Sequence, residues 1–160
     1  MSSTTPRWLA GLTLAFALAA PVLAQQTPAG ADGLVRVRSA YSMDETIRRI
    51  RADIADKGIL FFQAVDQSAL AAKAGISLRP STLLEFGNPP LGAQFLTANP
   101  SAGLDWPVRL LVSQDESGAV WATWTDFAWI ARRHGIVNRQ EQFAKATSVV
   151  ESITSTVAAH

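Results

Sequence analysis

Apolar and polar residues follow two spacings along the chain, and the spacings separate strands from helices. Residues 34–39 alternate, with Val35 and Val37 on one side and Arg36 and Arg38 on the other, which predicts a strand with one wet or partner-facing side. Further strands are predicted at residues 81–86, 107–113 and 119–125, the last two joined by a hairpin loop that ends in glycine.

Residues 59–65 differ from these strands because both of their faces are apolar. A strand of this kind is typical of a sheet interior, where both faces are covered. We therefore expect it to be central.

Helices are predicted between the strands. Ser42 and Glu45 form a capping box, Ile47, Ile50 and Ile54 follow at helical spacing as far as about Lys57, and Gly58 supplies the left-handed residue that ends the helix. The remaining predicted starts are Asp66, Asn88, Asp126 and the capping pair Asn138 and Glu141.

This order of elements predicts an α+β fold, a two-layer α/β sandwich. We expect a mixed sheet of about five strands with helices mainly on one face, in a single domain over residues 34–160. Four large apolar side chains on the strands exceed what a wet sheet face allows, which indicates a covering helix or a homodimer: Leu60, Phe62, Leu111 and Trp121.

The N-terminus has the three parts of a secretory leader. Arg7 precedes an apolar run, and Val22-Leu23-Ala24 offers a signal-peptidase site. We expect cleavage after Ala24, a flexible lead-in at residues 25–33, and a periplasmic or secreted chain. The alternative is an uncleaved anchor, but the apolar run is shorter than the roughly 20 residues that span a bilayer. We expect no stable membrane insertion of the mature chain.

Charge and composition exclude several partners. Arg7 is the only charged residue of the leader, so cleavage takes the 14 basic residues to 13, equal to the 13 acidic ones. A neutral chain lacks the basic excess that nucleic acid selects. The chain has no cysteine, so disulfides, thiolate metal sites and cysteine nucleophiles are excluded. With one histidine in the domain, no metal site and no cofactor are expected.

Three segments in order, Phe86-Gly87-Asn88-Pro89, Leu104 to Arg109, and Trp124-Thr125-Asp126 with Arg133-His134-Gly135, resemble the landmarks of the DUF302 family. The resemblance covers residues 41–136. It implies a small exported α/β domain that assembles as dimers in some members, and it implies no established activity. This chain has Gln67, Pro90 and Trp124 where similar members often carry a histidine, a basic residue and a tyrosine.

The best candidate binding residues lie where strands meet loops. In the segment 104–109, Asp105, Trp106 and Arg109 bring together an acid, an aromatic ring and a guanidinium, which predicts either an ion pair that pins the loop or a ligand contact. Asn88 caps a helix at a strand-to-helix corner, where Pro89 and Pro90 remove two donors that a phosphate would use. The corner is therefore expected mainly to turn the chain.

Asp126 is a further ligand-binding candidate, because Trp121, Trp124 and Trp129 could form an aromatic wall beside it. Alternation places Trp121 and Trp124 on opposite faces of their strand, so the three rings cannot all line one pocket.

Two functions stay open on these residues. We favour a non-enzymatic module that binds a small molecule or a partner protein. A hydrolase using Asp66, Asp105 or His134 would require at least two of these side chains to converge within hydrogen-bond reach. Otherwise Asp66 is expected to cap a helix and His134 to lie at a helix end. A third possibility is a structural accessory of an envelope complex.

Overall fold

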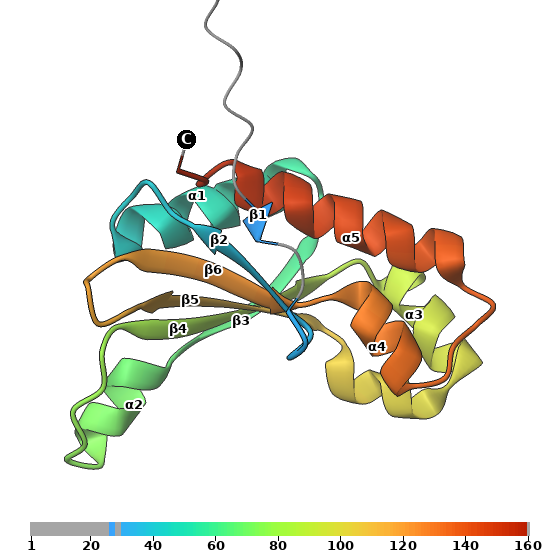
Figure 1. Ribbon diagram of the computed structural model, residues 1–160, viewed down its shortest axis with the longest axis horizontal. Helices are drawn as coiled ribbons and strands as arrows, with labels where there is room; N and C mark the ends of the chain where they lie inside the picture. Colours follow the sequence, from blue (N-terminus) through green and yellow to red (C-terminus); the bar gives the residue numbers. More distant parts are fainter. Residues whose placement is uncertain (1–25, 28–29, 160) are drawn as a thin grey trace, which may run out of the picture.

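The computed structural model describes residues 26–27 and 30–159, so the predicted leader and its cleavage site lie outside the described residues. Six strands form one sheet and helices pack mainly on one of its faces (Figure 1). The strands are β1 (Gln26–Thr27), β2 (Leu34–Arg38), β3 (Leu60–Asp66), β4 (Ser81–Gly87), β5 (Val108–Gln114) and β6 (Val120–Thr125). The helices are α1 (Met43–Asp56), α2 (Gln67–Lys73), α3 (Pro89–Ala98), the 3-10 helix η1 (Pro100–Asp105), α4 (Phe127–Arg133) and α5 (Gln140–Ser155).

The α+β two-layer fold is confirmed, but the sheet is not mixed. Its order is β1-β2-β6-β5-β4-β3, and every neighbouring pair is antiparallel. Strands that alternate with helices are typical of parallel neighbours joined by crossover helices, which is why the element order predicts a mixed sheet. In the structure, α2 and the α3–η1 segment lie beyond the strand ends, so each returns the chain antiparallel beside the strand it left. Only α1 crosses the sheet, from β2 to the far edge strand β3.

The position predicted for the third strand in the sheet was also wrong. β3 is an edge strand, and two of its large apolar side chains stay exposed, with Leu60 53% and Phe62 45% accessible. An apolar pattern on both faces indicates that a strand is covered on both faces. It does not show whether the covering group comes from the same chain or from another molecule. Here the folded chain leaves these side chains uncovered.

The core lies between the sheet and the helices α1 and α5, which run across one face in Figure 1. The register places Leu84 opposite Leu110 and Leu110 opposite Trp124, and all three are buried. The isoleucines Ile50 and Ile54 of α1 are fully buried against this layer, as their spacing predicted. Leu111 and the partly exposed Trp121 alternate onto the opposite face.

Local signals placed most helix ends correctly. Ser42 caps α1 by accepting from the Glu45 N–H at 3.4 Å, and Gly58 has φ +63°. The reciprocal half of the capping box is replaced: the Glu45 carboxylate binds Arg48 and Arg49 at 2.5 and 2.6 Å, and these guanidiniums hold the pKa of Glu45 below its ordinary value.

The capping pair predicted for the last helix was wrong. Arg139 occupies the cap position of α5 and makes no side-chain capping hydrogen bond. Asn138 lies one residue earlier, outside the position from which a cap side chain reaches the second and third helical N–H groups. The buried residues of α5 match the predicted spacing: Phe143, Ala146, Val150 and Ile153.

Candidate functional site

A cavity of about 370 Å³ lies between the end of β4, the first turn of α3, the start of β5 and the middle of α5. We call it the Asn88 cavity. Its apolar lining consists mainly of Ile59, Phe86, Leu91, Val108, Val149 and Val150. Its volume lies within the range of roughly 300–1,000 Å³ that small-molecule sites occupy.

The Gly87-Asn88 corner forms one wall of this cavity. As predicted, Asn88 caps α3: its Oδ1 accepts from the Leu91 N–H at 3.0 Å, and Pro89 and Pro90 occupy the first two helical positions. The backbone carbonyl of Asn88 also accepts from the Leu91 and Gly92 N–H groups. The helix donors at this corner are therefore removed or already bonded, and the corner does turn the chain.

The polar lining of the Asn88 cavity carries hydrogen-bond donors and no carboxylate. It consists of Asn88, Lys57 and Lys145. Lys57 is bound to Asp53 at 2.5 Å. Within the described residues Lys145 forms no ion pair, and the amide nitrogen of Asn88 donates to no protein group. The cavity thus combines an apolar interior with uncommitted donors.

Trp106 supports the same corner from outside the cavity lining. A Cβ placed on Gly92 would lie 2.0 Å from the Trp106 Nε1, and one on Gly87 would lie 3.2 Å from it. The ring also packs edge-on to Phe62, with centroids 5.9 Å apart. Trp106 therefore packs directly on two glycine backbones, and the sequence-predicted ligand contact of this residue stays a prediction.

Asp105 holds a second polar site, which joins η1 to the end of α4. Its carboxylate lies 2.6 Å from His134 Nε2 and 3.1 Å from Arg133 Nη1, and its side chain is only 7% exposed. Arg109 lies 3.4 Å from the same carboxylate and also donates to the Leu104 carbonyl. The predicted ion pair between Asp105 and Arg109 is therefore present, and it pins the loop before β5.

Two residues of this site were missed from the sequence. Ser101 Oγ lies 3.0 Å from His134 Nδ1, and the Asn99 amide donates to the His134 carbonyl at 2.8 Å. Because that bond fixes the amide orientation, Asn99 Oδ1 faces Ser101 and accepts from its N–H and hydroxyl. About thirty residues separate the two segments, so no local spacing connects them. We call this group the Asp105 cluster: Asn99, Ser101, Asp105, Arg109, Arg133 and His134.

The Asp105 cluster has the residue types of a serine nucleophile, a base and an orienting acid. The Ser101 hydroxyl lies within hydrogen-bond distance of two groups, the imidazole Nδ1 of His134 and the Asn99 Oδ1, and its single proton can be donated to only one of them. A neighbouring cavity lined by Asp105 and Arg109 holds about 20 Å³, little more than one water molecule.

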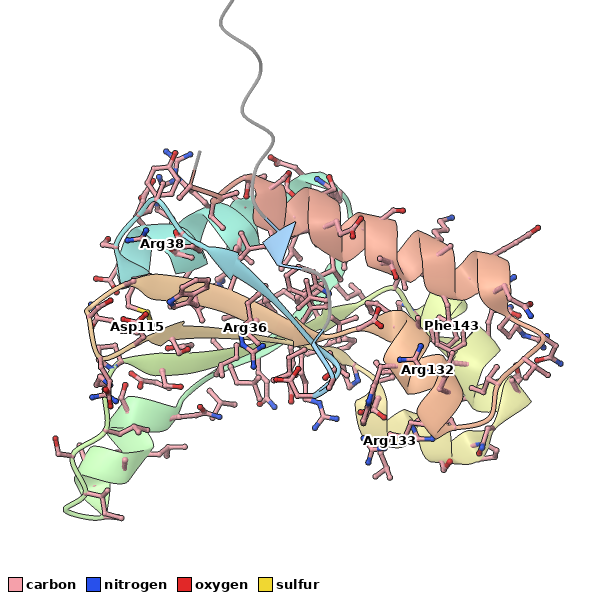
Figure 2. All side chains as sticks on the ribbon, in the orientation of Figure 1. Arg36, Arg38, Asp115, Arg132, Arg133 and Phe143 are labelled. Carbon is pink, nitrogen blue, oxygen red and sulfur yellow. The ribbon has the colours of Figure 1, made fainter. Side chains whose placement is uncertain are left out.

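Figure 2 shows Arg133 on α4, beside the 3-10 segment η1 that carries Ser101 and Asp105. The convergence of Asp105 and His134 meets the geometric requirement set for a hydrolase, whereas Asp66 takes no part in it. Asp66 caps α2 by accepting from the Ala69 N–H at 2.8 Å. The hydrogen bond from Ser68 lowers the pKa of Asp66.

The fold separates Trp121 from Trp124 and uses Asp126 as a helix cap. Asp126 caps α4 by accepting from the Ala128 and Trp129 N–H groups. Trp124 is buried in the core, whereas Trp121 lies on the opposite face and donates to Asp115 at 2.8 Å. The expected opposition of the two rings is confirmed. Of the ligand-binding candidates, Asn88 lines the larger cavity and Asp105 and Arg109 the small one, while Trp106 and Asp126 line neither.

The described ranges contain no group of three or more histidine, cysteine, aspartate or glutamate residues placed to hold a metal ion. A separate search of the same ranges finds no helix with the length and hydrophobicity to cross a bilayer.

Comparisons with known proteins agree with the fold. The family model described as "Domain of unknown function DUF302" matches residues 35–157. A crystal structure of an uncharacterised conserved DUF302 protein from Bacillus stearothermophilus superposes with a TM-score of 0.72 at 19% identity, covering 78% of this chain and 98% of that one. This likeness shows the fold alone.

Among curated proteins, the chain is similar to "Fluoride-specific ion channel FluC 1" of Brucella suis biovar 1 (strain 1330). The two are 43% identical over 104 residues, which cover 65% of this chain and 41% of that protein. The protein of the same name from Brucella abortus biovar 1 (strain 9-941) matches at 43% identity over 38% of its length. The matching segment thus spans less than half the length of these relatives.

Proposed function

The chain belongs to the DUF302 family, a domain of unknown function, and from this premise we propose that it is an exported, non-enzymatic module that binds a small molecule in the Asn88 cavity. The observation that carries the proposal is the cavity itself, about 370 Å³ with an apolar interior and uncommitted donors. Protein interiors are close-packed, so a void of this size at a junction of four elements is suited to a ligand.

A ligand screen by thermal shift tests this proposal. Compounds that raise the melting temperature of the chain are expected to lose their effect in Val149→Trp, because the larger ring fills the cavity. Val137→Trp is the matched control, since Val137 is 77% exposed and does not line the cavity. Hits that persist in Val149→Trp, or a broad screen without hits, would contradict the proposal.

A hydrolase is the second candidate, favoured by the contacts of Ser101 and Asp105 with His134. Two observations argue against a hydrolase. Asn99 competes with His134 for the Ser101 hydroxyl proton, and the cavity beside Asp105 is too small for a substrate. Turnover of p-nitrophenyl esters by the chain, abolished in Ser101→Ala and kept in the control Ser117→Ala, would establish this activity. If the chain is a non-enzymatic module, as we propose first, no ester turnover should depend on Ser101.

Export rests on the leader pattern of residues 1–24. A role as accessory of an envelope complex gains support from the relatives named as ion channels, in which a segment similar to this chain belongs to the same polypeptide. Fractionation of the native host is expected to recover a chain that starts at Gln25 outside the cytoplasm. Recovery of an intact N-terminus in the cytoplasm would refute export.

We also infer that two copies pair through β3 and α2. Five of the seven exposed large hydrophobic residues in the described part of the chain lie between residues 60 and 78, on or just after the edge strand β3: Leu60, Phe62, Leu70, Ile76 and Leu78. A free edge beside apolar side chains favours addition of another strand, and a second copy supplies one by two-fold symmetry.

Light scattering tests this pairing. The chain is expected to elute as a dimer, and Leu70→Glu is expected to yield monomers, because the new charge would be buried in the interface. Val137→Glu, a change of similar size on another exposed surface, is the control. A monomeric parent chain would refute the pairing.

A further inference from the structure

We propose that the Asn88 cavity selects an anion with an apolar tail, specifically a monocarboxylate of about a dozen non-hydrogen atoms. This inference rests on the proposed small-molecule binding and adds the chemical class of the ligand. The size follows from the 370 Å³ of the cavity, at roughly 30 Å³ for each water-sized group.

The charge of the ligand follows from the polar side chains of the lining. Within the described part of the chain they are two ammonium groups and one amide, and none of the residues that line the cavity is acidic. Lys57 shares its charge with Asp53, whereas Lys145, on the opposite side in α5, has no ionic partner in the described ranges. The uncommitted polar groups of the lining are therefore the Lys145 ammonium and the Asn88 amide N–H₂.

Both of these groups are hydrogen-bond donors. The Oδ1 of Asn88 accepts from the Leu91 N–H, which leaves it one lone pair. A carboxylate presents acceptors only, and its charge is opposite to that of the ammonium it binds. An amine would place its cationic group beside the Lys145 ammonium, and an alcohol would accept from that ammonium without the attraction between opposite charges. The lining thus ranks carboxylate above alcohol and alcohol above amine.

The apolar tail follows from the rest of the lining. Phe86 and Val150 are buried at the bottom of the cavity, and Ile59, Leu91, Val108 and Val149 are partly exposed around it. A fully polar anion such as phosphate would leave these side chains against water or against charge. An aliphatic or aromatic body removes their apolar surface from water, which is the main source of affinity.

Glu141 is the acidic residue to consider on α5, because it lies one turn before Lys145. It lines an adjoining open hollow together with Asn88 and Lys145. The two side chains form no ion pair in the structure, so Lys145 is available to a ligand. The Glu141 charge nevertheless reduces the attraction for an anion, and its removal is expected to tighten carboxylate binding.

The test compares octanoate, octanol and octylamine as probes in calorimetric titrations of the full chain. Octanoate is expected to bind about tenfold more tightly than octanol, and octylamine more weakly than both. Lys145→Gln should remove most of the advantage of octanoate over octanol, whereas Lys145→Arg should retain it. Glu141→Gln should increase octanoate affinity. Arg132→Gln is the control and should change nothing, because it removes a positive charge from an exposed position of α4 that does not line the cavity.

The possible outcomes separate the two proposals. If octanol binds as well as octanoate, and Val149→Trp abolishes both while Lys145→Gln affects neither, the cavity is a binding site but the carboxylate inference is overturned. If none of the three probes binds, the carboxylate inference also fails. The broad screen with Val149→Trp then decides independently whether the cavity binds anything else.

Discussion

The Asn88 cavity and the Asp105 cluster adjoin each other, since Val108 lines both the larger cavity and the small one beside Asp105. Their polar groups are used differently. In the cluster each side chain is bound to another, and the Asp105 carboxylate serves two arginines and a histidine. At the cavity, donors remain uncommitted above an apolar interior. Polar side chains whose hydrogen bonds are all made within the protein indicate a structural role. Polar side chains that keep free donors beside a cavity indicate binding.

The largest effect is expected from Asp105→Ala, which breaks the cluster. It leaves the nearly buried His134 without its acid, at a cost of about 3 kcal/mol in the free energy of unfolding, as for other partly buried pairs. Ser101→Ala should cost only about 1 kcal/mol, because it removes neutral hydrogen bonds. Urea unfolding followed by tryptophan fluorescence measures both.

The comparison predicts that neither cluster variant changes octanoate affinity at a temperature where the chain is folded. A loss of binding in Asp105→Ala without any loss of stability would reverse the roles assigned to the two regions.

A smaller effect is expected from Asn88→Ala, which affects both stability and binding. Loss of the cap on α3 costs about 1 kcal/mol, and loss of the amide removes one donor from the cavity. Asn88→Asp separates these contributions, because aspartate is an equally good cap but brings a negative charge to the cavity. It should keep the stability and weaken octanoate binding. If both variants bind octanoate as tightly as the parent chain does, the amide does not contact the ligand.

The smallest effect is expected at Asp115, a saturated carboxylate at the other end of the sheet (Figure 2). Hydrogen bonds from Ser117 and Trp121 lower its pKa from 3.8 to about 2. Because the folded-state pKa is the lower one, this carboxylate stabilises the fold above about pH 4. The stabilisation is lost as the pH falls from 3.8 towards 2.

Urea unfolding at pH 5, 4, 3 and 2 measures this dependence. Asp115→Asn should make the stability less dependent on pH in the window between 3.8 and about 2, and it should leave ligand binding unchanged. An unaltered pH profile in the variant would show that Asp115 does not contribute.

Local features of this protein follow from residues that are close together in the sequence. Ser42, Asp66, Asn88 and Asp126 each cap the helix that their position predicted, because a cap and its N–H partners lie within three residues. The spacing of apolar residues likewise determined the buried sides of α1 and α5, and the order of the predicted strands and helices indicated the α+β fold. The capping pair predicted at Asn138 failed because it lay one residue from the position that the helix start requires.

The contacts between segments that are far apart in the sequence could be seen only in the tertiary structure. It placed the apolar β3 at the edge of an antiparallel sheet, brought Ser101 to His134 across about thirty residues, and set Lys145 of α5 against the Asn88 corner. No periodic pattern or short spacing in the sequence indicates any of these three features. Each depends on how helices and strands pack after they form. The helix caps could therefore be predicted from the sequence, whereas the Asn88 cavity and the assembly of the Asp105 cluster could not.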